Sequence, residues 1–225
     1  MHIKNISKNL IKINNKHYAT LSKKEGYNVY GERIIRYKNR EYRIWNPTKS
    51  KLGAALHNKI PINIIKKIES SNYILYLGIA NGTTASHLED LNPNAMIFGV
   101  EISPRSIIDL VYMIKKRKSN IIPILENAAH PLRYSFMVAK SDILYVDIAQ
   151  PHQTDIALRN GELFLKKGGL LFLAIKTRSI DIKKKPVEIV KKEIEKIESY
   201  GYEISFSTML DPYERDHGFV VAIKK

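Results

Sequence analysis

A short turn of small residues, Gly78 to Thr84 (GIANGTT), directly follows the apolar run Tyr73–Leu77. Small residues in such a turn let a ligand approach the main chain at the carboxyl edge of a parallel sheet. Glu101 ends the next apolar run, 19 positions after Gly82. This matches the spacing of about 20 residues at which a carboxylate accepts hydrogen bonds from ribose hydroxyls. The pattern predicts a nucleotide-type cofactor, and a tight turn without any ligand is the alternative.

The turn has the form G-x-A-x-G, which differs from the G-x-G-x-x-G of dinucleotide-binding folds. It lacks the third glycine, which in those folds brings the following helix close to the strand. Among the cofactors that this architecture binds, the turn therefore favours S-adenosylmethionine over NAD.

Two charged side chains stand at the ends of later apolar runs. Asp147 follows Ile143–Val146, and Lys176 follows Leu170–Ile175. Carboxyl ends of parallel strands meet at one edge of the sheet, where open α/β folds bind ligands. A lysine there could stabilise a developing alkoxide, or act as a base if burial lowered its pKa. The aspartate could orient that lysine. The structural alternatives are an aspartate that caps a helix and a lysine that only extends to solvent.

Alternating strand-like and helix-like segments occupy the chain from residue 73 onward. Five apolar runs alternate with segments of helical character, a pattern that predicts a doubly wound, mostly parallel α/β sheet. The runs are Tyr73–Leu77, Ala95–Val100, Ile121–Leu125, Ile143–Val146 and Leu170–Ile175, and the helical segments are Thr84–Leu91, Arg105–Lys118 and Gln153–Phe164. Pro186 suits the first turn of a further helix that Gly201 ends. The last two strands, Tyr202–Met209 and Phe219–Ile223, must run antiparallel because their loop is short.

The first 60 residues read differently. Lys12–Tyr18 and Val29–Trp45 alternate polar and apolar residues, with turns expected at Tyr27-Asn28 and Lys38-Asn39. This predicts a small antiparallel β subdomain, followed by a helix through Lys51–His57. The expected division is a basic β-rich subdomain over residues 1–60 and a cofactor-binding domain over residues 61–225.

Composition and charge narrow the class of protein. The 225 residues include no cysteine, and 37 Lys and Arg stand against 22 Asp and Glu. Residues 1–72, here called the basic segment, hold 16 of those basic residues and only 4 acidic ones. Such an excess favours a polyanion partner, and a solvated lysine-rich surface or an anionic membrane are the alternatives. No apolar run approaches the ~20 residues that cross a bilayer, and no signal peptide is recognisable. We therefore expect a cytoplasmic protein. The seven histidines have no metal-ligand spacing, so no metal is expected.

Several stretches together resemble the fibrillarin family over about residues 20–225. They are VYGE (29–32), WNPTKSKLGAAL (45–56), YLGIANGTTASHLEDL (76–91), VEISPRS (100–106), NIIPILENAAHP (120–131), YVDIAQP (145–151), FLKKGGLLFLAIKTRSID (164–181) and DPYERDHGFVV (211–221). The absence of a Gly/Arg-rich extension makes the chain similar to the archaeal, fibrillarin-like form. The resemblance implies a seven-stranded class I (Rossmann-like) methyltransferase fold.

The resemblance also implies an activity, namely methylation of ribose 2′-hydroxyls in rRNA and tRNA with S-adenosylmethionine. It implies a box C/D guide RNA, a Nop-domain scaffold protein and a ribosomal-type kink-turn-binding protein as partners. The family's catalytic tetrad falls on Lys51, Asp147, Lys176 and His217. The family's cofactor-binding positions fall on Gly78, Ala80, Gly82, Thr83, Thr84, Glu101, Ile102, Asn127, Ala128, Asp147, Ile148, Ala149 and Gln150.

The chain departs from the family pattern at three places. Asn127 and Ala129 stand where the family usually has aspartate and arginine, and Lys49 stands where an arginine commonly precedes the serine. An asparagine can still accept a hydrogen bond through its carbonyl oxygen, but without the charge. These changes leave one alternative function, a methyltransferase-like subunit that holds RNA and scaffold protein with little or no catalysis. A small-molecule O-methyltransferase fits the sheet but not the basic segment.

Overall fold

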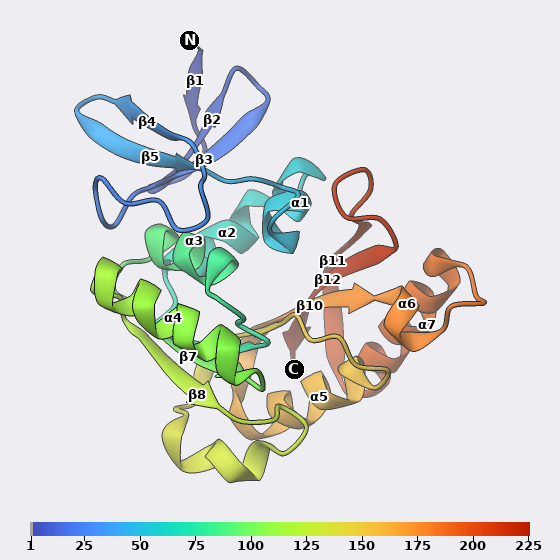
Figure 1. The fold of residues 1–225 in the computed structure, drawn as a ribbon. Helices are drawn as coiled ribbons and strands as arrows, with labels where there is room; N and C mark the ends of the chain where they lie inside the picture. The colour runs from blue at the N-terminus through green and yellow to red at the C-terminus, as the bar shows by residue number, and fades with distance from the viewer. Residues whose placement is uncertain (1) are drawn as a thin grey trace.

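The computed structural model describes residues 2–225, which form two β-sheets and their covering helices (Figure 1). The larger sheet has seven strands in the order β11-β12-β10-β9-β6-β7-β8. Its strands are β6 (Tyr73–Leu77), β7 (Met96–Glu101), β8 (Ile121–Leu125), β9 (Ser141–Val146), β10 (Leu165–Lys176), β11 (Tyr202–Met209) and β12 (His217–Lys224). Strands β8, β7, β6, β9 and β10 run parallel, whereas β12 is antiparallel to both β10 and β11. The predicted mostly parallel sheet and antiparallel final pair are confirmed.

Helices cover both faces of the larger sheet, as the long apolar runs require. Strands that bury both faces read as continuous apolar segments without alternation. One face packs against α1 (Lys51–His57), α2 (Ile62–Glu69), α3 (Thr83–Leu91) and α4 (Pro104–Arg117). The other face packs against α5 (Gln153–Phe164), α7 (Pro186–Ser199) and the 3₁₀ turn η1 (Pro131–Met137), and the short α6 (Thr177–Ile180) follows β10. The sheet is therefore doubly wound.

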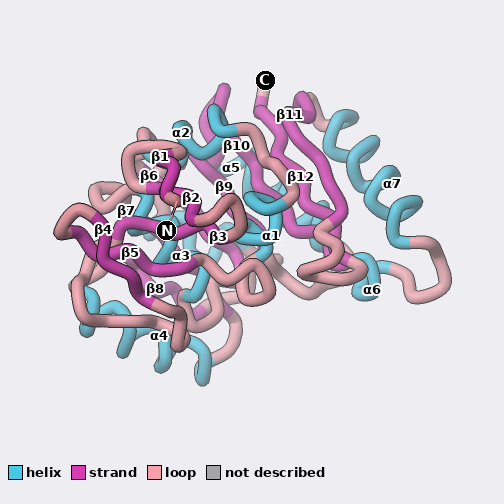
Figure 2. The backbone as a smooth tube through the Cα atoms, turned by 90° about the horizontal axis from the view of Figure 1, so that it is seen from above, coloured by secondary structure: helices cyan, strands magenta, loops and turns pink. Residues whose placement is uncertain are grey.

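The smaller sheet is antiparallel, with the order β1-β2-β3-β5-β4. Its strands are β1 (Ile3–Asn5), β2 (Leu10–Ile13), β3 (His17–Leu21), β4 (Ile34–Tyr37) and β5 (Arg40–Ile44). Figure 1 shows it above α3, and in Figure 2, seen from above, it lies over α3 and beside α1. A small core of its own holds Ile11, Ile13, Ala19 and Tyr42. The predicted antiparallel character of the N-terminal segment is confirmed, and its separation from residues 61–225 as a subdomain stays a prediction.

Three details of the predicted elements are wrong. Lys12–Tyr18 is not one strand, because a turn at Asn14-Asn15, both with positive φ, breaks it into the hairpin of β2 and β3. The expected turn at Tyr27-Asn28 lies instead at Glu25-Gly26, and no strand begins before Ile34 in that region. The fifth apolar run extends back to Leu165 through an irregularity in its pairing with β9. Helix α2 and the turn η1 were not predicted.

A buried cluster of six charged side chains joins the small sheet to α3 and α4. It consists of Lys23, Glu32, Arg43, Glu89, Asp90 and Arg117. The Arg43 guanidinium, fully buried on β5, lies 2.7 Å from Asp90 Oδ2 and also pairs with Glu32. Arg117 of α4 reaches the other oxygen of Asp90 at 2.7 Å. Burial opposes the charge of Arg43, but the two carboxylates outweigh it and raise its pKa. The charges of three cations and three anions thus balance one another.

His87 lies inside this junction, fully buried on α3. Its Nδ1 is 2.8 Å from the Thr20 hydroxyl and its Nε2 is 2.8 Å from the Tyr30 hydroxyl. Its ring stacks on Trp45, with centroids 4.6 Å apart. Burial, and then the charges of Arg43 and Arg117, hold the pKa of His87 well below 6.5. The folded chain therefore keeps this ring neutral.

Across the part of the chain that the structure describes, no helix combines the length and apolarity needed to span a bilayer.

The neutral His87 makes stability depend on pH. The unfolded chain takes up a proton at this histidine below pH 6.5, and the folded chain does so only at much lower pH. The contribution of neutral His87 to the free energy of unfolding is therefore complete above pH 6.5 and is lost as the pH falls. We expect the free energy of unfolding to fall between pH 6.5 and 5 with a slope that His87 raises by up to about 1.4 kcal/mol per unit.

Denaturant titrations at several pH values test this expectation on the wild type and on His87→Gln, whose amide can still bond Thr20 and Tyr30. The variant should show the shallower slope, whatever its absolute stability. His152→Gln, at a side chain that is 81% exposed, serves as the control. Equal slopes for His87→Gln and the wild type would contradict the assignment.

Candidate active site

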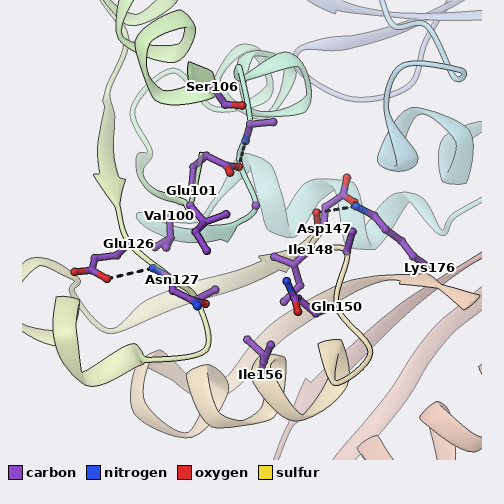
Figure 3. Close-up of a pocket in the computed structure, with 15 residues that line it drawn as sticks. Val100, Glu101, Ser106, Glu126, Asn127, Asp147, Ile148, Gln150, Ile156 and Lys176 are labelled. Atoms are coloured by element: carbon purple, nitrogen blue, oxygen red, sulfur yellow. Dashed lines mark hydrogen bonds and ion pairs between the residues drawn. The ribbon is translucent and has the colours of Figure 1, made fainter. Parts of the chain in front are cut away.

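A cavity of about 330 Å³ opens at the carboxyl ends of the parallel strands (Figure 3). It lies where the strand order reverses, between the neighbours β6 and β9. Open α/β sheets bind ligands at this switch point. Figure 3 shows Glu101 and Asn127 on one side of the cavity and Asp147 and Lys176 on the other. We call it the strand-end cavity.

The glycine turn after β6 forms the floor of this cavity. Gly78 has a φ of +76°, and a Cβ there would lie 2.6 Å from the carbonyl oxygen of Asp147. Only glycine permits both the left-handed conformation and this close approach of two strand ends. The approach is fixed by a hydrogen bond from the Asp147 N–H to the Leu77 carbonyl at 2.9 Å. The turn therefore brings the end of β6 directly against the end of β9.

Glu101, the last residue of β7, presents its carboxylate to the cavity. One oxygen accepts the N–H of Ala80 at 2.9 Å, and the other accepts the N–H of Ser103 at 2.9 Å. A carboxylate oxygen can accept more than one hydrogen bond. Glu101 is therefore held rigidly while both oxygens keep capacity for the hydroxyls of a ribose.

Asn127 lines the wall beyond the end of β8. Its Oδ1 accepts the N–H of Ala129 at 2.9 Å, which forms a local turn. One lone pair of Oδ1 and both hydrogens of Nδ2 remain available. The side chain can therefore donate to a ring nitrogen and accept from an amino group, as the edge of an adenine requires.

Asp147 lies between two lysines. Lys176 Nζ is 2.9 Å from Asp147 Oδ1, and Lys51 Nζ is 3.3 Å from Asp147 Oδ2. Lys176 also donates to the main-chain carbonyl of Asp147 at 3.1 Å. The side chains of all three residues are 14–20% exposed. Two cations and one anion leave a net positive charge at the mouth of the cavity, where it would stabilise a developing oxyanion.

Two buried tyrosines, Tyr76 on β6 and Tyr145 on β9, lie beside each other in the sheet, with ring centroids 4.5 Å apart. Burial raises the pKa of both phenols well above 10, and the negative charge of Asp147 adds to the effect. Both therefore stay protonated and add no negative charge to the positive field of the two lysines.

The structure gathers most of the predicted site residues. The strand-end cavity is lined by Gly78, Ala80, Glu101, Ile102, Asn127, Ala128, Asp147, Ile148, Ala149, Gln150 and Lys176. Gly82, Thr83 and Thr84 are not among its lining residues. Gly82 fits tightly against α4, where a Cβ would meet Met113 at 2.4 Å. Thr84 is buried and donates to the Ser50 hydroxyl that caps α1.

His217, the fourth predicted catalytic residue, does not line this cavity. Its main chain pairs with Lys176 across β12 and β10. Its Nδ1 lies 2.7 Å from the Arg215 carbonyl, and Glu214 is 4.0 Å away. The structure thus places His217 beside Lys176 along the sheet, with its ring held by its own loop.

Sequence reasoning missed four lining residues, which are Val100, Ser106, Glu126 and Ile156. The rule that selected Glu101 also applies to Glu126, because it follows β8 directly. Val100 precedes Glu101 on the same strand. Ser106 and Ile156 come from α4 and α5, and only the packing of those helices brings them to the cavity.

Comparison with known proteins decides the family, since a family model described as fibrillarin matches residues 2–225. The chain belongs to the fibrillarin family. A relative from Pyrococcus abyssi, named fibrillarin-like rRNA/tRNA 2′-O-methyltransferase, is 47% identical over 92% of this chain and 89% of its own length.

Solved fibrillarin structures agree with the fold. The Methanococcus jannaschii fibrillarin pre-rRNA processing protein superposes with a TM-score of 0.91 at 40% identity, over 99% of this chain and 97% of its own. Aeropyrum pernix fibrillarin, solved with natively bound S-adenosyl-L-methionine, gives 0.84 at 40% identity, over 99% and 100%. A fibrillarin in complex with Nop5p gives 0.86 at 34% identity, also over 99% and 100%.

The close approach at Gly78 yields a test with a matched control. Gly78→Ala should weaken binding of S-adenosylmethionine by about tenfold or more, because the added Cβ forces Asp147 out of place. Gly168 also has a positive φ, of +73°, but nothing lies within 4 Å of its Cβ position. Gly168→Ala should therefore lose only the backbone term of roughly 1–2 kcal/mol in stability and keep its affinity.

Isothermal titration calorimetry with S-adenosylmethionine and thermal melting measure the two effects separately. Unchanged affinity in Gly78→Ala, or an equal loss of affinity in both variants, would show that the approach of Gly78 to Asp147 does not shape the cofactor site.

Proposed function

We propose that this chain transfers a methyl group from S-adenosylmethionine to ribose 2′-hydroxyls of rRNA and tRNA. The observation that carries the proposal is Asp147, which two lysine ammonium groups hold at the mouth of the strand-end cavity. The resemblance in sequence and the name of the Pyrococcus abyssi relative support the same activity.

The strand-end cavity has the donors and acceptors that S-adenosylmethionine requires. Glu101 would bind the ribose hydroxyls, Asn127 the adenine edge, and the main chain from Asp147 to Gln150 the methionine end. When bound, the cofactor supplies an electrophilic methyl group on a positively charged sulfur. The chain's own task is to position the ribose hydroxyl in line with that methyl group.

Lys176 is the group that we assign to the hydroxyl oxygen. A lysine ammonium has three N–H donors and no acceptor. The carbonyl oxygen of Asp147 accepts one of them, and Oδ1 of Asp147 lies 2.9 Å from the same nitrogen as its ion-pair partner. A remaining N–H can donate to the 2′-oxygen and stabilise the charge that develops on it. This geometry favours the role of a cation for Lys176 over that of a base.

Asp147 is the acceptor that we assign to the hydroxyl proton. As the new oxygen–carbon bond forms, the hydroxyl becomes strongly acidic, so that a weak base in hydrogen-bond reach is sufficient. The products are then the methyl ether, the neutral thioether and a proton on the carboxylate. Lys51 holds Oδ2 at 3.3 Å and orients the carboxylate for this step. His217 remains a candidate for orienting the RNA.

The family and the surface of the chain support a set of proposed partners. The basic segment suits the phosphates of a guide RNA and its target, and a box C/D guide would supply the choice of nucleotide. A Nop-domain scaffold protein is supported by the fibrillarin solved with Nop5p. Exposed apolar side chains such as Phe136, which is 84% exposed on η1, suit a protein contact. A kink-turn-binding protein completes the proposed particle.

Substitutions at the lysine–aspartate centre test the chemistry. Lys176→Ala and Asp147→Asn should each lower the rate of methyl transfer by about 10²–10³-fold, because the first removes the cation beside the reacting oxygen and the second removes the acceptor of its proton. Lys176→Ala should keep cofactor affinity. The matched controls are Lys166→Ala and Asp142→Asn, which break a 2.6 Å ion pair between the same two strands at their opposite ends.

The assay uses a particle reconstituted with guide RNA, target and partner proteins, and follows a radiolabelled methyl group. Full activity of Lys176→Ala and Asp147→Asn would refute the catalytic assignment. A wild-type chain that assembles into the particle but transfers no methyl group would favour the alternative of an RNA- and scaffold-binding subunit.

The departure at Asn127 gives a prediction in the opposite direction. Asn127→Asp keeps the acceptor for the Ala129 N–H and adds a negative charge, and charge-assisted hydrogen bonds are roughly twice as strong as neutral ones. Affinity for S-adenosylmethionine should rise by about fivefold, as calorimetry would measure. Asn94→Asp, the same change at an exposed site, is the control. A loss of affinity for S-adenosylmethionine in Asn127→Asp would show that Asn127 acts on the cofactor only as a hydrogen-bond donor.

A further inference from the structure

A second cavity of about 410 Å³ lies between the small sheet, the segment before α1 and the loop between β11 and β12. We call it the junction pocket. Six of its lining residues carry the argument, namely Lys16, Arg33, Pro47, Thr48, His57 and Tyr213. Its volume falls within the range of about 300–1,000 Å³ that is usual for small-ligand sites. The catalytic chemistry proposed above does not use it.

Three separate parts of the chain are fixed around this pocket. Asn58, at the end of α1, donates to the carbonyls of Met209 and Asp211 at 2.6 and 3.1 Å, so that the β11–β12 loop (red in Figure 1) is held beside α1. His57 Nε2 lies 3.1 Å from the carbonyl of Lys16 in the β2–β3 turn. The pocket is therefore built from segments that contact one another.

Aromatic rings line one side of the junction pocket. The His57 ring contacts Tyr213, with centroids 5.0 Å apart, and its centroid lies 5.1 Å from that of Tyr18, which is not a lining residue. Tyr213 is half-buried and lines the pocket together with Pro47. Aromatic faces of this kind bind nucleobases by stacking, with little dependence on which base is present.

Basic side chains surround the opening. Lys16 and Arg33 are exposed. Burial, and then the charges of Lys16 and Arg33, lower the pKa of His17, which also lines the pocket. Glu32 is the acidic residue among the lining residues, and its side chain is 1% exposed and paired with Arg43. The free charge at the opening is therefore positive and complements phosphate.

The junction pocket and the lysine–aspartate centre are connected by two short stretches of chain. Thr48 is three residues before Lys51, and Tyr213 is four residues before His217. Three extended residues span at most about 11 Å, which equals roughly three stacked nucleotides at 3.4 Å each. A strand that presents its ribose at Lys176 would therefore pass this pocket within a few nucleotides.

We propose that the junction pocket binds a nucleotide of the target RNA strand within about three positions of the methylated ribose. Its base stacks against Tyr213 and His57, and its phosphate contacts Lys16 and Arg33. The inference rests on the proposed function, because it gives the target strand a second point of contact next to the reacting one. Two contacts fix the direction of the strand as well as its position.

Charge-neutralising pairs test the phosphate contacts in the reconstituted particle. Lys16→Gln with Arg33→Gln should raise the KM for target RNA by about tenfold, leave kcat nearly unchanged and reduce the salt slope of binding by about 1 to 2. The control pair Lys38→Gln with Arg40→Gln removes the same charge from the exposed β4–β5 hairpin, outside the pocket. Equal effects of the two pairs would overturn the proposal.

The stacking contact has its own test. Tyr213→Leu should raise KM for target RNA by about tenfold, and Tyr213→Phe should restore it, because the ring and not the hydroxyl stacks on a base. In the wild-type particle, 4-thiouridine placed within three nucleotides of the target should crosslink to the peptide that holds Tyr213 or His57. Crosslinks that map only to other peptides would refute the assignment.

Three further outcomes separate the hypotheses. If variants of Lys16 and Arg33 bind the scaffold protein more weakly but bind the RNA normally, the junction pocket is a protein interface. This result would overturn the RNA assignment. A wild-type particle that neither binds S-adenosylmethionine nor transfers methyl groups would refute the proposed function itself. If the wild-type particle is active and the pocket variants bind target RNA as the wild type does, only the inference about the pocket is refuted.

Discussion

The buried ion cluster around Asp90 is the constraint on which the arrangement of the whole chain depends. Removing one partner from a buried ion pair costs about 3–5 kcal/mol, because the other charge is left without water or counterion. Asp90 has two such partners, Arg43 from the small sheet and Arg117 from α4. The small sheet can therefore satisfy Arg43 in one position only, against α3. This fixes the basic segment relative to the catalytic centre, since Ile44, Trp45 and the start of α1 follow Arg43 directly in the chain.

The larger sheet could be predicted from the sequence because each of its parallel strands buries both faces. Such strands read as apolar runs, and the runs ending at Leu77, Leu125 and Val146 end where the strands end. The small sheet was harder to predict. Alternation of polar and apolar residues continues through a tight hairpin, so Lys12–Tyr18 looked like one strand although Asn14-Asn15 turns within it. The Asn-Asn pair was the available signal, because asparagine tolerates the left-handed conformation.

The residues of the candidate site also fall into those that the sequence predicts and those that it does not. Residues at strand ends, such as Glu101 and Asp147, could be selected because one rule of topology brings strand ends together. Lys51 was found only through family resemblance, since no local pattern shows that the side-chain nitrogen of a residue at a helix start lies 3.3 Å from Asp147 Oδ2. Ser106 and Ile156 had no signal, and neither did the ion cluster. Their positions depend on how α4, α5 and the small sheet pack, and packing of side chains from distant segments leaves no periodic trace in the sequence.

The buried position of Trp45 has a practical use. It is the only tryptophan in the chain, and it is fully buried between the stacked His87 ring and α1, where a Cβ on Gly53 would lie 2.8 Å from its ring. Its fluorescence therefore reports on a single place, the contact between the small sheet and the helix that carries Lys51. Docking of that contact shields the indole from water, and its opening would shift the emission to longer wavelength. The unmodified protein thus contains an optical probe that can follow opening of this contact without an attached dye.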